Sequence, residues 1–143
     1  MFKSVLVATD GSQTAAEAVR VAIELGTIFE ATLHVVNIYR PSAATTLAVA
    51  PVTIPAEVVE LGEDARTHVE SVATLARQKG LAAKSHVASG DPANQIVGIP
   101  KDHGVDLIVV GNRGMRGLKR VLGSVPNAVA HRAPCAVLIV NTT

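Results

Sequence analysis

Two glycine-containing segments near the C-terminus have the residue types and spacing of an anion-binding site. An apolar run over residues 105–110 leads directly into Gly111-Asn112-Arg113-Gly114, and Gly123-Ser124 follows. Because glycine lacks a Cβ, main-chain N–H groups at Gly111 and Gly114 can approach a charged oxygen closely. Phosphate is bound by such groups. The two segments therefore predict one site for a polyphosphate.

Ser124 precedes residues 125–132, which have the pattern of a helix. In that position we expect its hydroxyl to cap the first turn, where the free N–H groups and the helix dipole favour an anion. A purely structural alternative stays open. In it the glycines only form a tight turn after the strand and Ser124 only caps a helix; for the isolated Gly111 and Gly114 pair this is the more common case.

Asp10 is the only carboxylate at three predicted strand ends. The first apolar run ends in Ala8-Thr9-Asp10-Gly11-Ser12, the second in Val35 to Asn37, and the fourth in the glycine segment. In open parallel sheets ligands bind beyond the carboxyl ends of strands, where the strand order reverses, and an acidic residue there accepts hydrogen bonds from ribose hydroxyls. An Asx turn with Gly11 or a helix cap explains the same residue equally well.

Strand and helix patterns alternate along the whole chain. Short β-branched runs predict five strands, over residues 3–9, 31–38, 84–88, 105–110 and 136–140. Apolar residues at helical spacing predict four helices between them, over residues 13–25, 56–79, 93–103 and 125–132. This succession predicts an α/β fold, a Rossmann-like doubly wound five-stranded parallel sheet with four helices, in a single domain over residues 1–143.

Two segments depart from this pattern. Pro100 falls inside the third predicted helix, where it removes an N–H and crowds the preceding turn, so we expect a kink or a stop near Gly98-Ile99. The connection from Tyr39 to Ile54 is longer than usual. It fits a mobile lid or, more commonly, a variable surface loop.

Composition excludes several classes of protein. With 13 basic and 12 acidic residues the net charge is +1, so no strong field attracts nucleic acid or an anionic membrane. Cys135 is the single cysteine, which excludes an internal disulfide, and it is expected to pack at the start of a buried strand. No signal peptide and no apolar run of the ~18 residues needed for a membrane span is visible, so a cytoplasmic location is expected.

The histidines and the common nucleotide motifs give no further site. His34, His68, His86, His103 and His131 lack the spacing of metal ligands, so no zinc site is predicted, and His34 is expected to be a hydrogen-bonded interior residue. No Gly-x-x-x-x-Gly-Lys-Ser/Thr is present, and no Gly-x-Gly-x-x-Gly follows the first strand. These absences argue against a P-loop NTPase and a dinucleotide enzyme.

The motifs together resemble the universal stress protein family, from residue 2 to about residue 141. The segments that carry the resemblance are residues 8–12, Leu33-His34-Val35, Gly90-Asp91-Pro92, residues 109–114 with Gly123-Ser124-Val125, and residues 133–140. The glycine motif resembles that of the family's nucleotide-binding (ATP-binding) branch. The resemblance implies that the ligand is ATP, or else AMP or cAMP, with Mg²⁺ accompanying ATP.

Carried over by position, the resemblance implies adenine near the first two strand ends, ribose near the aspartate, and phosphates in the glycine loop. The implied contact residues are Ala8, Thr9, Asp10, Val35, Gly111, Arg113, Gly114, Gly123, Ser124 and Val125. Met115 to Leu122 make the loop one residue shorter than is usual in the branch. No catalytic or metal-binding residue is assigned.

These observations indicate a stress-response protein that binds an adenine nucleotide and acts as a regulatory binding module. A slow ATPase or nucleotidyl-transfer enzyme of the same fold, or a nucleotide-free dimeric scaffold, are the alternatives. Efficient phosphoryl transfer needs a metal-holding carboxylate and a group that positions the nucleophile; Asp10 is a candidate for the first role and no residue for the second. The apolar segment Ala136 to Val140 is expected to be an edge strand, and a bare apolar edge is a template for pairing with a second copy in a homodimer. The resemblance to the universal stress protein family implies the same pairing.

Overall fold

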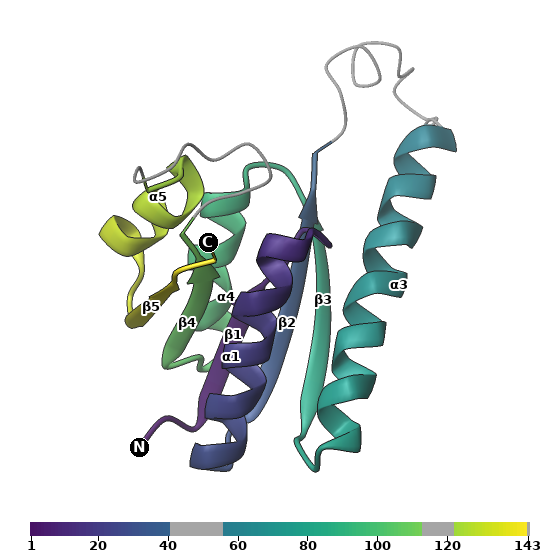
Figure 1. Ribbon diagram of the computed structural model, residues 1–143. Helices are drawn as coiled ribbons and strands as arrows, with labels where there is room; N and C mark the ends of the chain where they lie inside the picture. The colour runs from purple at the N-terminus through teal and green to yellow at the C-terminus, as the bar shows by residue number, and fades with distance from the viewer. Residues whose placement is uncertain (41–55, 113–121, 143) are drawn as a thin grey trace.

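The computed structural model describes residues 1–40, 56–112 and 122–142 and contains one parallel sheet with helices on both sides (Figure 1). The strands lie in the order β3-β2-β1-β4-β5. Their bounds are β1 Ser4–Ala8, β2 Thr32–Tyr39, β3 Ala83–Ser89, β4 Leu107–Gly111 and β5 Ala136–Val140. The helices are α1 Gln13–Phe29, α3 Ala56–Gln78, α4 Pro92–His103 and α5 Ser124–Arg132. Within the described residues, the predicted five-stranded parallel sheet with four helices is confirmed.

Alternate residues of each strand enter two separate hydrophobic cores. Val5 and Val7 of β1 face α1 and α3, whereas Leu6 between them faces α4 and α5. Side chains of a strand point alternately to opposite faces, so strands covered on both sides are apolar throughout. The central strands show this, since the first four residues of β1 and of β4 are all buried. The sheet is therefore doubly wound, as predicted.

Most predicted element ends agree with the structure to within two residues, but the end of α1 does not. The sequence predicts a helix over residues 13–25 that stops before Gly26, whereas the helix continues to Phe29 and is capped by Glu30, whose backbone is left-handed at φ 54°. The glycine serves packing instead. A Cβ on Gly26 would lie 3.3 Å from the Leu81 side chain, so the missing side chain lets α1 lie close to the segment before β3.

Pro100 does not interrupt α4. The helix runs from Pro92 to His103 and is closed by Gly104, which has a φ of 67°. The predicted stop near Gly98-Ile99 is therefore wrong. Asp91 caps the other end, where its side chain accepts a hydrogen bond from the Asn94 amide. Pro100 is buried near the helix C-terminus, where it lacks one main-chain donor without ending the helix.

None of the helices within the described ranges is long and apolar enough to cross a membrane. The connection from Tyr39 to Ile54, predicted as a lid or a surface loop, lies outside the described residues beyond residue 40.

Candidate functional site

The strand order reverses between β1 and β4, and this brings the first and fourth strand ends together. β1 pairs with β2 on one side and with β4 on the other. Val7 lies opposite Val109, so continuing the register by two residues places Thr9 beside Gly111. Crevices at such reversal points are where ligands bind in open parallel sheets. We call residues 8–12, 111–112 and 123–125 the strand-end site.

The turn after β1 is fixed by hydrogen bonds to its own side chains and to β2. The Thr9 amide donates to the Val36 carbonyl at 2.9 Å, and the Gly11 amide donates to the Thr9 hydroxyl at 3.2 Å. Gly11 has a φ of +83°, a conformation that strains residues with a side chain. Ser12 then caps α1 by accepting a hydrogen bond from the Ala15 amide at 3.1 Å. The main chain of this turn is therefore held in one conformation.

Asp10 is exposed and uses one carboxylate oxygen inside the turn. Its Oδ1 accepts a hydrogen bond from the Ser12 amide at 2.9 Å, which is the Asx turn that the sequence left open as an alternative. Among the described residues its Oδ2 has no hydrogen-bond partner. The Asx turn fixes the carboxylate, and the second oxygen remains available to a ligand hydroxyl.

A main-chain hydrogen bond joins the end of β4 to the start of α5. The Asn112 carbonyl accepts a hydrogen bond from the Gly123 amide at 2.8 Å, and the Asn112 amide donates to the Val140 carbonyl at 2.9 Å. The Gly111 and Gly123 segments are thereby brought together. Arg113 and Gly114, which the sequence assigns to the same loop, lie outside the described residues.

The start of α5 differs from the prediction by one residue. Gly123 is the N-cap and no side chain caps the helix, while Ser124 is its exposed first residue. The predicted capping role of Ser124 is wrong, because its backbone is already helical and its hydroxyl is past the cap position. The first amides of a helix have no partner within it, and Pro126 has no N–H, so the amides of Ser124 and Val125 are the donors that this end presents.

Val35 does not reach the strand-end site. It lies inside β2, pairs with Val7 and Ser85, and has no exposed surface in the core under α1 and α3. β2 continues for four residues beyond it, to Tyr39. Ala8 in contrast is the last residue of β1 and is half-buried at the crevice.

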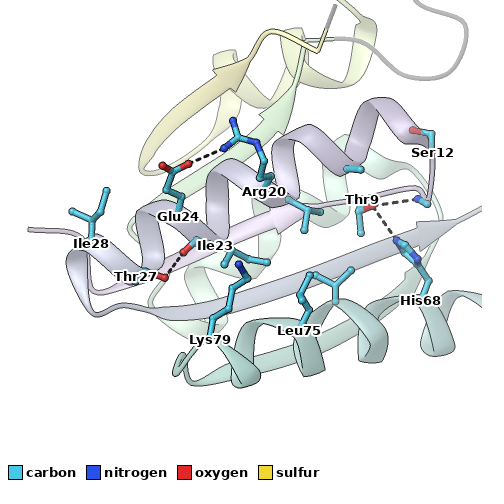
Figure 2. Close-up of a pocket in the computed structure, with 14 residues that line it drawn as sticks. Thr9, Ser12, Arg20, Ile23, Glu24, Thr27, Ile28, His68, Leu75 and Lys79 are labelled. Atoms are coloured by element: carbon cyan, nitrogen blue, oxygen red, sulfur yellow. Dashed lines mark hydrogen bonds and ion pairs between the residues drawn. The ribbon is translucent and has the colours of Figure 1, made fainter.

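His68 of α3 is a neighbour of the site that sequence reasoning missed. Its Nε2 lies 3.2 Å from the Thr9 hydroxyl, and its ring lies 3.9 Å from the position of a Cβ on Gly11 (Figure 2). These residues are 59 positions apart and belong to no common motif. Only the packing of α3 against the sheet reveals the contact.

A groove of about 940 Å³ extends from this end of the site between α1 and α3 (Figure 2). Thr9 and His68 lie at one end of its lining, and Thr27 and Lys79 at the other. Apolar side chains make up most of the wall between them: Val19, Ile23, Val72 and Leu75.

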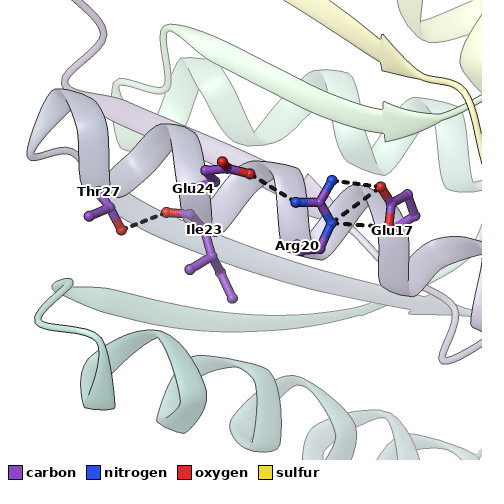
Figure 3. A network of polar contacts seen from close by, with 5 residues as sticks. All are labelled: Glu17, Arg20, Ile23, Glu24 and Thr27. Atoms are coloured by element: carbon purple, nitrogen blue, oxygen red, sulfur yellow. Dashed lines mark hydrogen bonds and ion pairs between the residues drawn. The ribbon is translucent and has the colours of Figure 1, made fainter.

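The rim of the groove carries paired charges. Arg20 contacts Glu17 at 2.7 Å and Glu24 at 2.9 Å along the exposed side of α1 (Figure 3). The hydrogen bond from Arg20 lowers the pKa of Glu17. Glu17 and Glu24 together exceed the single positive charge of Arg20 by one, and Lys79 at the far end of the groove carries a positive charge.

Comparisons with known proteins agree over nearly the full chain. The model of the universal stress protein family matches residues 1–141. Universal stress protein YxiE of Bacillus subtilis is 35% identical over 147 aligned residues, which cover 98% of this chain and 99% of that protein.

Solved structures give the same result. Hypothetical protein MJ0577 superposes with a TM-score of 0.85 at 27% identity and covers 99% of this chain and 96% of its own. A universal stress protein in complex with cAMP superposes with a TM-score of 0.75, also at 27% identity, and covers 99% of both chains.

Proposed function

The chain belongs to the universal stress protein family, and from that premise we propose that it binds an adenine nucleotide at the strand-end site. The related protein in complex with cAMP supports an adenine ligand. In this proposal the nucleotide-bound and nucleotide-free forms differ in what they present to partner proteins, so the chain acts as a regulatory module in a stress response. A cytoplasmic location and assembly into a homodimer through β5 are part of the proposal.

The observation that carries the proposal is the uncapped start of α5, held against the end of β4 by the hydrogen bond between Asn112 and Gly123. A helix end with free amides and a partial positive charge favours a phosphate group. Since the Gly111 and Gly123 segments lie on one side of the crevice and Thr9 on the other, a bound nucleotide would span it. The phosphates would contact Ser124 and Val125.

The remaining contacts follow from the positions along the crevice. We propose that Ala8 and Thr9 contact the base and that Oδ2 of Asp10 accepts a hydrogen bond from a ribose hydroxyl. Gly111 and Gly123 complete the phosphate side, together with Arg113 and Gly114, which we include from the sequence alone. Val35 is left out because it has no exposed surface.

We propose ATP as the preferred ligand, with AMP and cAMP as the competing candidates. Mg²⁺ binds through oxygen atoms and commonly keeps several waters while bridging phosphates and one or two carboxylates. Asp10 is the one carboxylate among the described residues of the strand-end site, which fits an ion held mainly by the nucleotide and by water.

Isothermal titration calorimetry tests the proposal. The protein is first stripped of nucleotide, and native mass spectrometry verifies that none is retained. MgATP, AMP, cAMP and MgGTP are then titrated separately. We expect one adenine nucleotide per chain and binding of MgGTP at least tenfold weaker than that of MgATP. No measurable binding of any adenine nucleotide by the stripped, folded protein would contradict the proposal.

A further inference from the structure

Three histidines from separate elements meet on the sheet face that α4 covers: His34 of β2, His86 of β3 and His103, the last residue of α4. His34 Nδ1 lies 2.9 Å from His86 Nε2, and the two rings are stacked with centroids 5.1 Å apart. The His103 ring centroid lies 4.7 Å from that of His86 and 5.7 Å from that of His34. One ring nitrogen from each residue lies within 4.8 Å of the other two.

Strand register and the end of α4 produce this cluster. His86 lies opposite Val36, two residues from His34, so His34 and His86 are diagonal neighbours on one face of the sheet. Gly104 ends α4 with its left-handed backbone and leaves His103 at the helix terminus above this pair. His34 is buried, His86 half-buried and His103 exposed, so the cluster opens to solvent.

Burial lowers the pKa of two of the three rings. Burial, followed by the positive charges of His86, His103 and Lys84, lowers the pKa of His34 to about 4. Burial also lowers the pKa of His86, with the charges of His103 and Lys84 adding to the effect. A metal ion binds the neutral form of imidazole, and a lowered pKa favours that form.

We propose that His34, His86 and His103 form a binding site for a divalent transition metal ion such as Zn²⁺. Imidazole is a preferred ligand of Zn²⁺, Cu²⁺ and Ni²⁺, and three histidines leave a fourth tetrahedral position to water. The predicted absence of a zinc site rested on spacing along the chain. Positions 34, 86 and 103 follow no ligand spacing because they are brought together only by the fold.

The geometry requires a small rearrangement on binding. Zn–N bonds of about 2.0–2.1 Å at tetrahedral angles separate two ligand nitrogens by about 3.3 Å. The His34 and His86 nitrogens, at 2.9 Å, are near that separation. The remaining nitrogen lies within 4.8 Å of these two, so it must move inward by at most about 1.5 Å, and His103 is the exposed side chain of the three.

Two features of the cluster oppose binding. The metal ion replaces the His34–His86 hydrogen bond, and the positive charge of Lys84 lies nearby. We therefore expect an affinity below that of a fully buried structural zinc site.

The test uses the full chain without an affinity tag, dialysed against a chelator and then titrated with ZnCl₂ by calorimetry. We expect one Zn²⁺ per chain and at least tenfold weaker binding in His103→Gln. His103 is exposed, so this variant should keep its fold, which far-UV circular dichroism verifies. His131→Gln is the matched control, because His131 is an exposed helical histidine outside the cluster and should leave zinc affinity unchanged.

A second measurement identifies the ligands directly. In two-dimensional NMR of the imidazole nitrogens, Zn²⁺ should shift the signals of His34, His86 and His103 and leave those of His68 and His131 in place. The proposal is overturned by no zinc binding, by equal affinity in the wild type and His103→Gln, or by an equal loss in His131→Gln. None of these results bears on nucleotide binding at the strand-end site, which is measured separately.

Discussion

The Asn112 carbonyl and the Gly123 amide form a hydrogen bond of 2.8 Å, so the chain returns to the end of β4 before it enters α5. The side chain of Asn112 makes a second connection. Its Oδ1 accepts hydrogen bonds from the amide of Thr142 at 3.1 Å and from its hydroxyl at 2.8 Å. One residue therefore joins the end of β4, the start of α5 and the segment after β5.

Replacing Asn112 with alanine should loosen this junction. The substitution removes Oδ1, the acceptor of both hydrogen bonds from Thr142, and leaves the main-chain hydrogen bond to Gly123 possible. Each neutral hydrogen bond contributes about 0.5–1.5 kcal/mol, so we expect the free energy of unfolding to fall by about 1–2 kcal/mol in urea denaturation. Thr142→Val removes only the hydroxyl donor and should cost roughly half as much. An unchanged urea midpoint in Asn112→Ala would show that the junction adds no stability.

Two substitutions of Asp10 separate its roles in the turn and in binding. Asparagine keeps an oxygen for the Ser12 amide but removes the charge, whereas alanine removes both. Loss of a hydrogen bond to a charged acceptor costs about 1.5–3 kcal/mol, so Asp10→Ala should raise the nucleotide Kd about 10- to 150-fold. Asp10→Asn should have a smaller effect. Calorimetry measures both, and Asp102→Asn, at the far end of α4, is the matched control. Unchanged affinity in both variants would remove Asp10 from the site.

ATP should be turned over slowly if at all. Asp10 is the one carboxylate among the described residues of the strand-end site, and no residue is assigned to position an attacking water molecule. Phosphoryl transfer requires both a metal-holding carboxylate and such a group. We expect phosphate release far below the ~1 s⁻¹ typical of slow enzymes. A phosphate assay with and without Mg²⁺ measures it. Mg²⁺-dependent release near that rate, lost in Asp10→Ala, would favour the enzymatic alternative.

Cys135 should react slowly with alkylating reagents. Burial raises the pKa of its thiol, and the negative charge of Asp106 raises it further. A raised pKa means less thiolate at pH 8, and the thiolate is the reactive form. Mass spectrometry with iodoacetamide should therefore show several-fold slower labelling in the folded protein than in urea. Equal rates in the two states would contradict the packing role expected from the sequence.

Local patterns predicted the elements well, and long-range contacts explain most of what they missed. The bounds of β5 agree completely because an apolar run follows Pro134 directly. Gly26 was misread as a helix stop because its partner, Leu81, is far away in sequence. The positions of His68 and of the three-histidine cluster depend on how α3, α4 and the strands pack. No window of sequence contains that information.

β5 is an edge strand, as predicted, and its exposed residues give the means to test the proposed dimer. Among the described residues it pairs only with β4. Leu138 is 37% exposed, whereas Val140 is 8% exposed and belongs to the core under α1 and α3. A lysine at 140 would disturb the core, so Leu138 is the cleaner position for a substitution.

Leu138→Lys should convert a dimer into a monomer without unfolding it. In an antiparallel pairing of two β5 strands about a two-fold axis, the same position occurs on both sides of the interface, so the substitution brings two like charges close together. We expect sedimentation velocity at micromolar concentration to give a dimer for the wild type and a monomer for the variant, with unchanged circular dichroism. Ile28→Lys, which places the same charge on an exposed apolar residue of α1, should remain dimeric. Since an apolar strand edge is a template for pairing, a wild type that sediments as a monomer would mean that something other than a second copy protects β5.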